Sequence, residues 1–177
     1  MSLKRFGSGS DLAPDGLIIL ENYGLTVYMA QLFERKLQNV ITALERLGEI
    51  TLPPETVRSG DGFVDTCLGP MLRVLEAQTK MGREMSRLLK KAHYQRNLLV
   101  HRFMTDNIID MLNSAGRASI NDKLEHIFKN VCRAEHVVSQ LAEQLWAHLG
   151  VSPDWVQQQV EELHRLKDNQ PNDDSPD

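Results

Sequence analysis

The sequence predicts an all-α fold, an up-and-down bundle of about five helices, and three observations carry this prediction. Apolar residues recur every three or four positions along most of the chain, which is the period of an amphipathic helix. Strong helix formers such as Leu, Ala, Glu, Gln, Arg and Lys are plentiful. No segment of useful length alternates apolar and polar residues as a half-buried strand does.

The chain has 177 residues, which suits one domain with a core of ordinary size. We expect a single helical domain over residues 15–168. A Gly/Ser-rich, flexible segment over 1–14 precedes it, and an acidic tail with two prolines over 169–177 follows it. The tail has the composition of a disordered segment.

The first helix is expected over 15–47, where apolar residues keep helical spacing. Gly24 interrupts this pattern, either as a kink or as a point of close approach. Gly48 is a natural stop at the C-terminal end. The prolines and glycines of residues 49–62 then predict a loop.

A second helix is expected over 63–78, with Pro70 bending it or starting a fresh helix. The helical pattern returns over 81–113, with a break near His93 as the alternative to one continuous helix. Residues 113–119 read as a turn. Ser119 and Asp122 then form a capping-box-like start of a helix that runs to residue 149.

The last helix follows Gly150, which is expected to end the preceding one. Ser152 is placed to cap it, and Pro153 takes the first helical position, where its missing N–H costs nothing.

Charge and cysteine content limit the classes of function. The net charge is −4 and the isoelectric point about 5.9, so a strong polyanion binder with a broad basic face is not expected, although this charge is compatible with a small local basic site. Cys67 and Cys132 are too few for a disulfide framework, which favours a reducing, cytoplasmic location. The chain lacks both the apolar block of a signal peptide and a run of the ~20 residues that span a bilayer, so no membrane association is expected.

Polar side chains occupy an unexpected position in the helix predicted over 81–113. On a helical wheel, Asn97 and His101 fall on the arc of Val100 and the apolar residues that follow, with Arg96 at its border. Burying such groups without partners costs about 1–3 kcal/mol each. Either neighbouring helices satisfy them by hydrogen bonds in a closed core, or this face lines a cleft or the seam of a dimer.

The stretch "RNLLVH", residues 96–101, resembles the R-x4-6-H motif of the HEPN superfamily, in which a polar residue, often Asn, follows the arginine. The Leu- and Ala-rich helix before it, the long early helix "GLTVYMAQLFERKLQNVITAL" and the later "TCLGPML" are also similar to bacterial HEPN-like proteins. The resemblance covers roughly residues 15–150.

The resemblance implies a homodimer of helical bundles with two such motifs at the seam. Many HEPN proteins are metal-independent endoribonucleases of toxin or defence type, in which the RNA 2′-hydroxyl attacks its own phosphate. By position, His101 would be the general acid or base, and Arg96 would hold the phosphate. Asn97 would orient the histidine or donate to a phosphate oxygen. No cofactor is implied.

Further residues near the motif are candidates for contact with RNA. Lys90, Lys91 and Arg102 would supply positive charge, and Tyr94 would stack on a base. For the two lysines, an ordinary solvated helix surface is the preferred interpretation. The resemblance also places the first helix near the motif, which makes Glu34 and Gln31 candidates for contact with it, although a solvated pair is the preferred interpretation.

Other kinds of site receive less support. His126 and His136 each follow a glutamate, but the HExxH and CxxC spacings of zinc sites do not occur, so no metal site is expected. A catalytically silent HEPN-like interaction or regulatory module is the alternative to the nuclease, motivated by the acidic charge. An antitoxin-like or regulatory partner of another protein is a third hypothesis.

Overall fold

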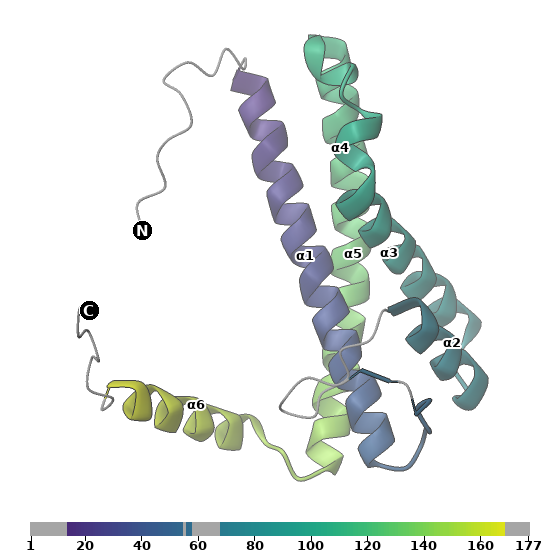
Figure 1. Cartoon of the computed structure of the whole chain (residues 1–177), viewed down its shortest axis with the longest axis vertical. Coiled ribbons are helices and arrows are strands. Elements are labelled where there is room, and N and C mark those ends of the chain that lie inside the picture. Colours follow the sequence, from purple (N-terminus) through teal and green to yellow (C-terminus); the bar gives the residue numbers. More distant parts are fainter. Residues whose placement is uncertain (1–13, 55, 58–67, 169–177) are drawn as a thin grey trace, which may run out of the picture.

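The computed structural model describes residues 14–54, 56–57 and 68–168, and it confirms the all-α prediction (Figure 1). No strand occurs among these residues. The elements are α1 (Pro14–Arg46), α2 (Leu68–Gln78), α3 (Arg83–His101), α4 (Phe103–Asp106), the 3-10 helix η1 (Asp110–Leu112), α5 (Ser114–His148) and α6 (Pro153–Asp168). The expected flexible ends fall outside these ranges, apart from Pro14, which begins α1.

Three long helices form the bundle. Asn22 of α1 bonds Asn121 of α5 at 2.6 Å, and Lys36 pairs with Glu135, so both contacts join residues 99 positions apart. Because the sequence separation is the same at both contacts, α1 and α5 run parallel. Helix α3 packs alongside this pair in the opposite direction, with α2 folded against its first half, while α6 extends away from the bundle (Figure 1).

The core lies along the inner faces of α1, α3 and α5. The buried residues of α5 recur at alternating spacings of four and three: Ile120, Leu124, Ile127, Val131, Ala134 and Val138. This spacing keeps them on one stripe of the helix. Phe33 and Leu37 of α1 and Leu99 of α3 are at most 1 % exposed. Each such side chain contributes about 1.5–3 kcal/mol by leaving water.

Tyr23 joins the upper part of α1 to the end of α3. Its hydroxyl donates to the backbone oxygen of Leu99 at 2.9 Å, and its ring stacks on Phe103 with 6.0 Å between centroids. These contacts fix the height at which α3 ends, and they therefore position the residues just before Leu99.

Most of the predicted helix ends are confirmed. Gly48 and Gly150 have φ values of 75° and 77°, the left-handed conformation that closes a helix at little cost for glycine. The Ser152 hydroxyl accepts from the backbone N–H of Trp155 at 3.1 Å, as an N-cap does.

The predicted start of α5 is wrong. Residues 114–119 are helical, because the Asn113 side chain accepts a hydrogen bond from the N–H of Gly116 at 2.8 Å and caps the helix six residues before Ser119, the expected cap. Gly24 does not interrupt α1, and a side chain there would meet nothing within 4 Å. Helix α2 begins at Leu68, close to the fresh start expected at Pro70; residues 63–67 lie outside the described residues.

The long helix predicted over 81–113 is broken, but at Arg102 and not at His93. Arg102 has φ −138°, which ends α3, and the chain continues through α4 and η1. The helical wheel treated Ile108, Met111 and Leu112 as part of the same helix as Asn97 and His101. These three residues lie beyond the end of α3, so the apolar face was assigned incorrectly. The buried residues of α3 are instead Leu89, Ala92, Gln95 and Leu99.

Gly116 is required where α5 meets η1. A Cβ atom at this position would lie 2.2 Å from the backbone oxygen of Asp110. We expect Gly116→Ala to lower the free energy of unfolding by about 1–3 kcal/mol, because the backbone of η1 must move. Gly24→Ala is the matched control, and it should raise stability by about 0.5–1 kcal/mol. Denaturant unfolding of both variants measures this, and equal gains would contradict the close approach.

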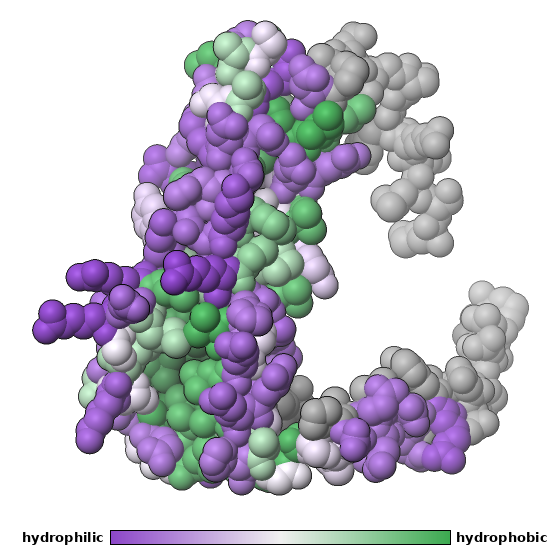
Figure 2. Space-filling model, turned by 180° about the vertical axis from the view of Figure 1, so that it is seen from behind, coloured by the Kyte–Doolittle hydropathy of each residue, from purple (hydrophilic) through white to green (hydrophobic). Residues whose placement is uncertain are grey.

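The exposed large apolar side chains are concentrated toward one end of the bundle. In α1 they are Leu17, Ile18, Leu20, Leu25 and Tyr28, and after α3 they are Ile108, Ile109 and Leu112. The start of α1 and the α4 region lie at the same end in Figure 1. Figure 2 shows a second hydrophobic area in the lower half of the opposite face, flanked by hydrophilic side chains. Within the described residues, no helix combines the length and apolar character that crossing a bilayer takes.

Candidate active site around Arg96 and His101

Arg96 is held by a carboxylate from another helix. Its Nε and Nη2 atoms lie 2.9 and 2.7 Å from Oε2 of Glu34 in α1. The two side chains are 23 % and 19 % exposed, so the pair is partly shielded from water. The preferred interpretation of Glu34 as a solvated residue is wrong, because it contacts the motif helix through Arg96, whereas Gln31 is exposed.

Asn97 extends this arrangement along α3. Its Oδ1 accepts from Nη1 of Arg96 at 3.1 Å, and its amide nitrogen lies 3.1 Å from Nε2 of His93. Glu34, Arg96, Asn97 and His93 thus form one connected chain of hydrogen bonds, called here the Arg96 cluster. It fixes the guanidinium plane relative to both α1 and α3.

His93 is the member that the sequence reasoning missed. Its position three residues before Arg96 and four before Asn97 places all three on neighbouring parts of one helix face, which is the signal that would have found it. Helix α2 packs Gly69 against the ring, since a side chain there would lie 3.5 Å from Cε1 of His93.

Burial lowers the pKa of His93 below its usual 6.5, the Arg96 guanidinium lowers it further, and Glu34 opposes both effects. The folded protein therefore favours the neutral imidazole. Neutral His93 is able to accept from, or donate to, the Asn97 amide, depending on its tautomer.

This shift predicts a pH-dependent stability. Below pH 6.5 the unfolded chain binds a proton at His93 that the folded chain does not yet bind, so the free energy of unfolding falls as the pH drops below 6.5. Above that pH the contribution is complete. We expect His93→Gln to flatten this part of the profile. Urea unfolding across the acidic range measures it, and an unchanged slope in the variant would refute the assignment to His93.

His101 lies apart from the Arg96 cluster. It is the last residue of α3 and is exposed, as is Val100. Its predicted place on a packed face is wrong within a single chain, because α3 ends before Arg102 and the apolar residues that follow do not continue its face. Five residues along a helix correspond to a rise of about 7.5 Å and a turn of about 140°, so Arg96 and His101 of one chain do not share a face.

The residues expected to contact RNA divide into two groups. Lys90 pairs with Glu76 of α2 at 2.6 Å, and Arg102 pairs with Asp106 at 3.4 Å, so carboxylates neutralise both cations. Lys91 contacts only the Asn130 amide among the described residues, at 3.2 Å. Tyr94 is 68 % exposed.

Metal-binding residues do not gather in the described part of the chain, where no group of three or more His, Cys, Asp or Glu side chains could hold an ion. Glu34, in direct contact with Arg96, is occupied by that cation.

Comparison with known proteins adds no relative: no protein-family model, no curated protein and no solved structure matches the chain.

Proposed function

We propose that the chain is a HEPN-like homodimer that cleaves RNA without a metal ion, as a nuclease of toxin or defence type in a reducing cytoplasm. The proposal is supported by the different surroundings of two residues in one short motif. Arg96 is fixed by Glu34 and Asn97, whereas the His101 ring, one and a half turns later, is exposed to solvent. A fixed cation suits phosphate binding and an exposed imidazole suits proton transfer, once the two are brought together.

The dimer is part of the proposal because one chain keeps these groups apart. Exposed apolar side chains near the end of α3, such as Val100 and Ile108, support a partner at this place. A two-fold axis there would bring each motif to the other, so that one site contains two arginines and two histidines.

The reaction follows from this composition. One His101 imidazole removes the proton from the 2′-hydroxyl, whose oxygen attacks the adjacent phosphorus. The partner's imidazolium gives a proton to the departing 5′-oxygen, and Arg96 opposes the negative charge that develops on the phosphoryl oxygens. The products are a 2′,3′-cyclic phosphate and a 5′-hydroxyl.

A cleavage assay tests the proposal. The purified protein, incubated with single-stranded RNA in the presence of EDTA, should produce fragments with cyclic phosphate ends. A 2′-O-methyl RNA of the same sequence should remain intact, because its attacking oxygen is blocked. Cleavage of both RNAs, or of neither, would reject this mechanism.

A catalytically silent interaction module is the second candidate, and one observation favours it. The Arg96 guanidinium already has a carboxylate partner, so its role is satisfied without a substrate. The nuclease requires a positive charge at position 96 itself, whereas the silent module requires only an ion pair between positions 34 and 96.

A further inference from the structure

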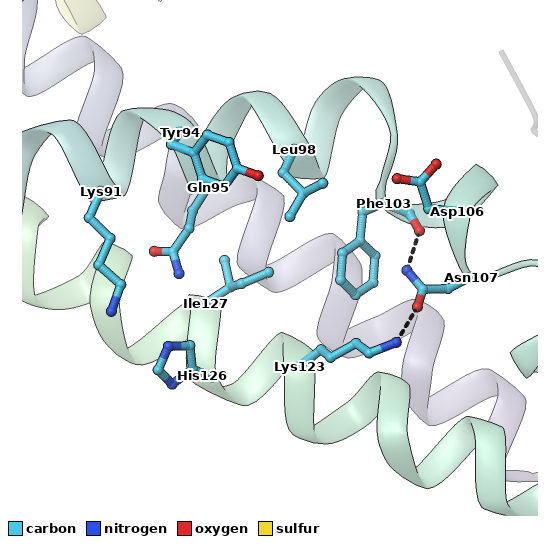
Figure 3. A pocket seen from close by; sticks show the side chains of 10 residues that line it. All are labelled: Lys91, Tyr94, Gln95, Leu98, Phe103, Asp106, Asn107, Lys123, His126 and Ile127. Carbon is cyan, nitrogen blue, oxygen red and sulfur yellow. Dashed lines mark hydrogen bonds between the residues drawn. The ribbon is translucent and has the colours of Figure 1, made fainter.

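A groove between α3 and α5 lies beside the Arg96 motif and contains none of the cluster's residues (Figure 3). Its volume is about 500 Å³, within the range of small-molecule sites. Leu98, Phe103 and Ile127 form its apolar surface. The groove is open to solvent along one side, so a flat ligand reaches it without any movement of the helices.

Gln95 lines this groove and carries an unsatisfied acceptor. The residue is 6 % exposed, and its Oε1 atom is buried with no hydrogen-bond partner among the described residues. Leaving such an atom unpaired costs about 1–3 kcal/mol. A leucine would fill the same space on the buried face of α3 without that cost. The glutamine is therefore placed to pair with a donor that the described part of the chain does not supply.

Side chains at the two ends of the groove differ in charge. Lys91, Tyr94 and His126 stand together at one end in Figure 3. No described carboxylate pairs with Lys91, so its ammonium is available to an anion. Tyr94 and His126 present rings to solvent, and Tyr94 is 68 % exposed.

The opposite end of the groove is already neutralised. Lys123 donates to Asn107 Oδ1 at 2.7 Å and lies 3.5 Å from Asp110, and Asn107 in turn donates to the backbone oxygen of Phe103 at 2.7 Å. Asp106 at the same end pairs with Arg102. This end therefore offers no site for a further anion, which leaves the Lys91 end.

We propose that this groove binds one nucleotide, with the base against the apolar wall and the phosphate on Lys91. The Gln95 side chain turns its amide toward the groove, where Oε1 accepts from a base N–H; the amide presents donor and acceptor side by side, as a base edge does. Tyr94 and His126 supply stacking surfaces, and stacking contributes about 1–3 kcal/mol per base. The nucleotide is either free or one unit of a single-stranded RNA.

The proposal extends the proposed nuclease by a base-binding site, but its test does not depend on cleavage. The probes are AMP and UMP for the free source, and a short single-stranded 2′-O-methyl RNA for the polymer, which binds without being cut. Binding is followed by titration calorimetry on the full chain. Saturable binding of any probe supports the site, and no binding of all three overturns it.

Gln95→Leu gives the sharpest variant, because it removes an unpaired acceptor and should leave the melting temperature equal or higher. Its affinity for the probe that binds should fall about tenfold, the loss of one buried hydrogen bond. Gln140→Leu, at an exposed glutamine of α5, is the control and should bind as the parent does. Unchanged affinity in Gln95→Leu would overturn the proposal.

Lys91→Gln tests the phosphate contact separately. For the 2′-O-methyl RNA, the slope of log affinity against log salt should decrease by about 0.7, the value for one phosphate contact on a single strand. Lys129→Gln is the control, since Lys129 pairs with Glu125 and does not line the groove. A protein that binds but never cuts RNA leaves this site standing and removes only the nuclease.

Discussion

Replacing His101 by alanine should lower the rate of RNA cleavage by about a hundredfold or more, the usual contribution of one general acid or base. The melting temperature should not change, because the ring is exposed and makes no hydrogen bond with any residue that the structure describes. Initial rates on a defined RNA, together with thermal unfolding of the same preparation, measure the two effects.

His136→Ala is the matched control for this variant. His136 is also an exposed histidine of a long helix, but it lies outside the motif. Its cleavage rate should equal that of the parent. If His101→Ala cleaves as fast as His136→Ala, a contaminating nuclease or another residue performs the reaction.

Exchanging the charges of Arg96 and Glu34 separates the nuclease from the silent module. Either single reversal, Arg96→Glu or Glu34→Arg, puts like charges in contact in a partly shielded place. Each should lower the free energy of unfolding by about 2–3 kcal/mol, somewhat less than for a fully buried pair. The double variant restores an ion pair with reversed polarity and should recover most of this loss.

In the double variant, RNA cleavage should not recover although stability does. In the double variant the cation belongs to α1 at position 34, and position 96 carries a carboxylate that repels phosphate. The nuclease proposal therefore requires a folded, inactive protein. Full cleavage by the double variant would show that Arg96 serves only to join α3 to α1. A matching measurement of oligomeric state excludes loss of the dimer as the cause.

The sequence allowed a good prediction of the fold because helical period and end signals act locally. Gly48, Gly150 and Ser152 determine helix ends through their own backbone or hydroxyl groups, and each was identified correctly. Asn113 was missed because Ser119 offered a similar capping pattern a few residues later. Only the hydrogen bond to Gly116 decides between the two.

The candidate site was predicted less completely, since its geometry depends on contacts between distant residues. The pair formed by Glu34 and Arg96 joins residues 62 positions apart, and a single sequence gives it no local signal beyond the resemblance. The exposure of His101 depends on where α3 stops. That stop follows from the backbone turn at Arg102, which no glycine or proline marks.

The burial of Gln95 shows the same limit. The residue lies on the same face of α3 as Leu99 and Ala92, and its amide faces inward because α5 packs over it. A polar residue at such a position is visible in the sequence only when the buried face of the helix is known. The wheel centred on Asn97 and His101 assigned that face incorrectly.

The most direct test of the central claim, that two motifs meet across a two-fold axis, is a distance between position 101 of two copies. A spin label at His101→Cys, in a background with Cys67→Ser and Cys132→Ser, reports this separation by pulsed dipolar spectroscopy. The account predicts a dimer in which labels at 101 lie closer together than labels at His136→Cys. A monomer with no dipolar coupling, or a dimer with the shorter distance at 136, would contradict it.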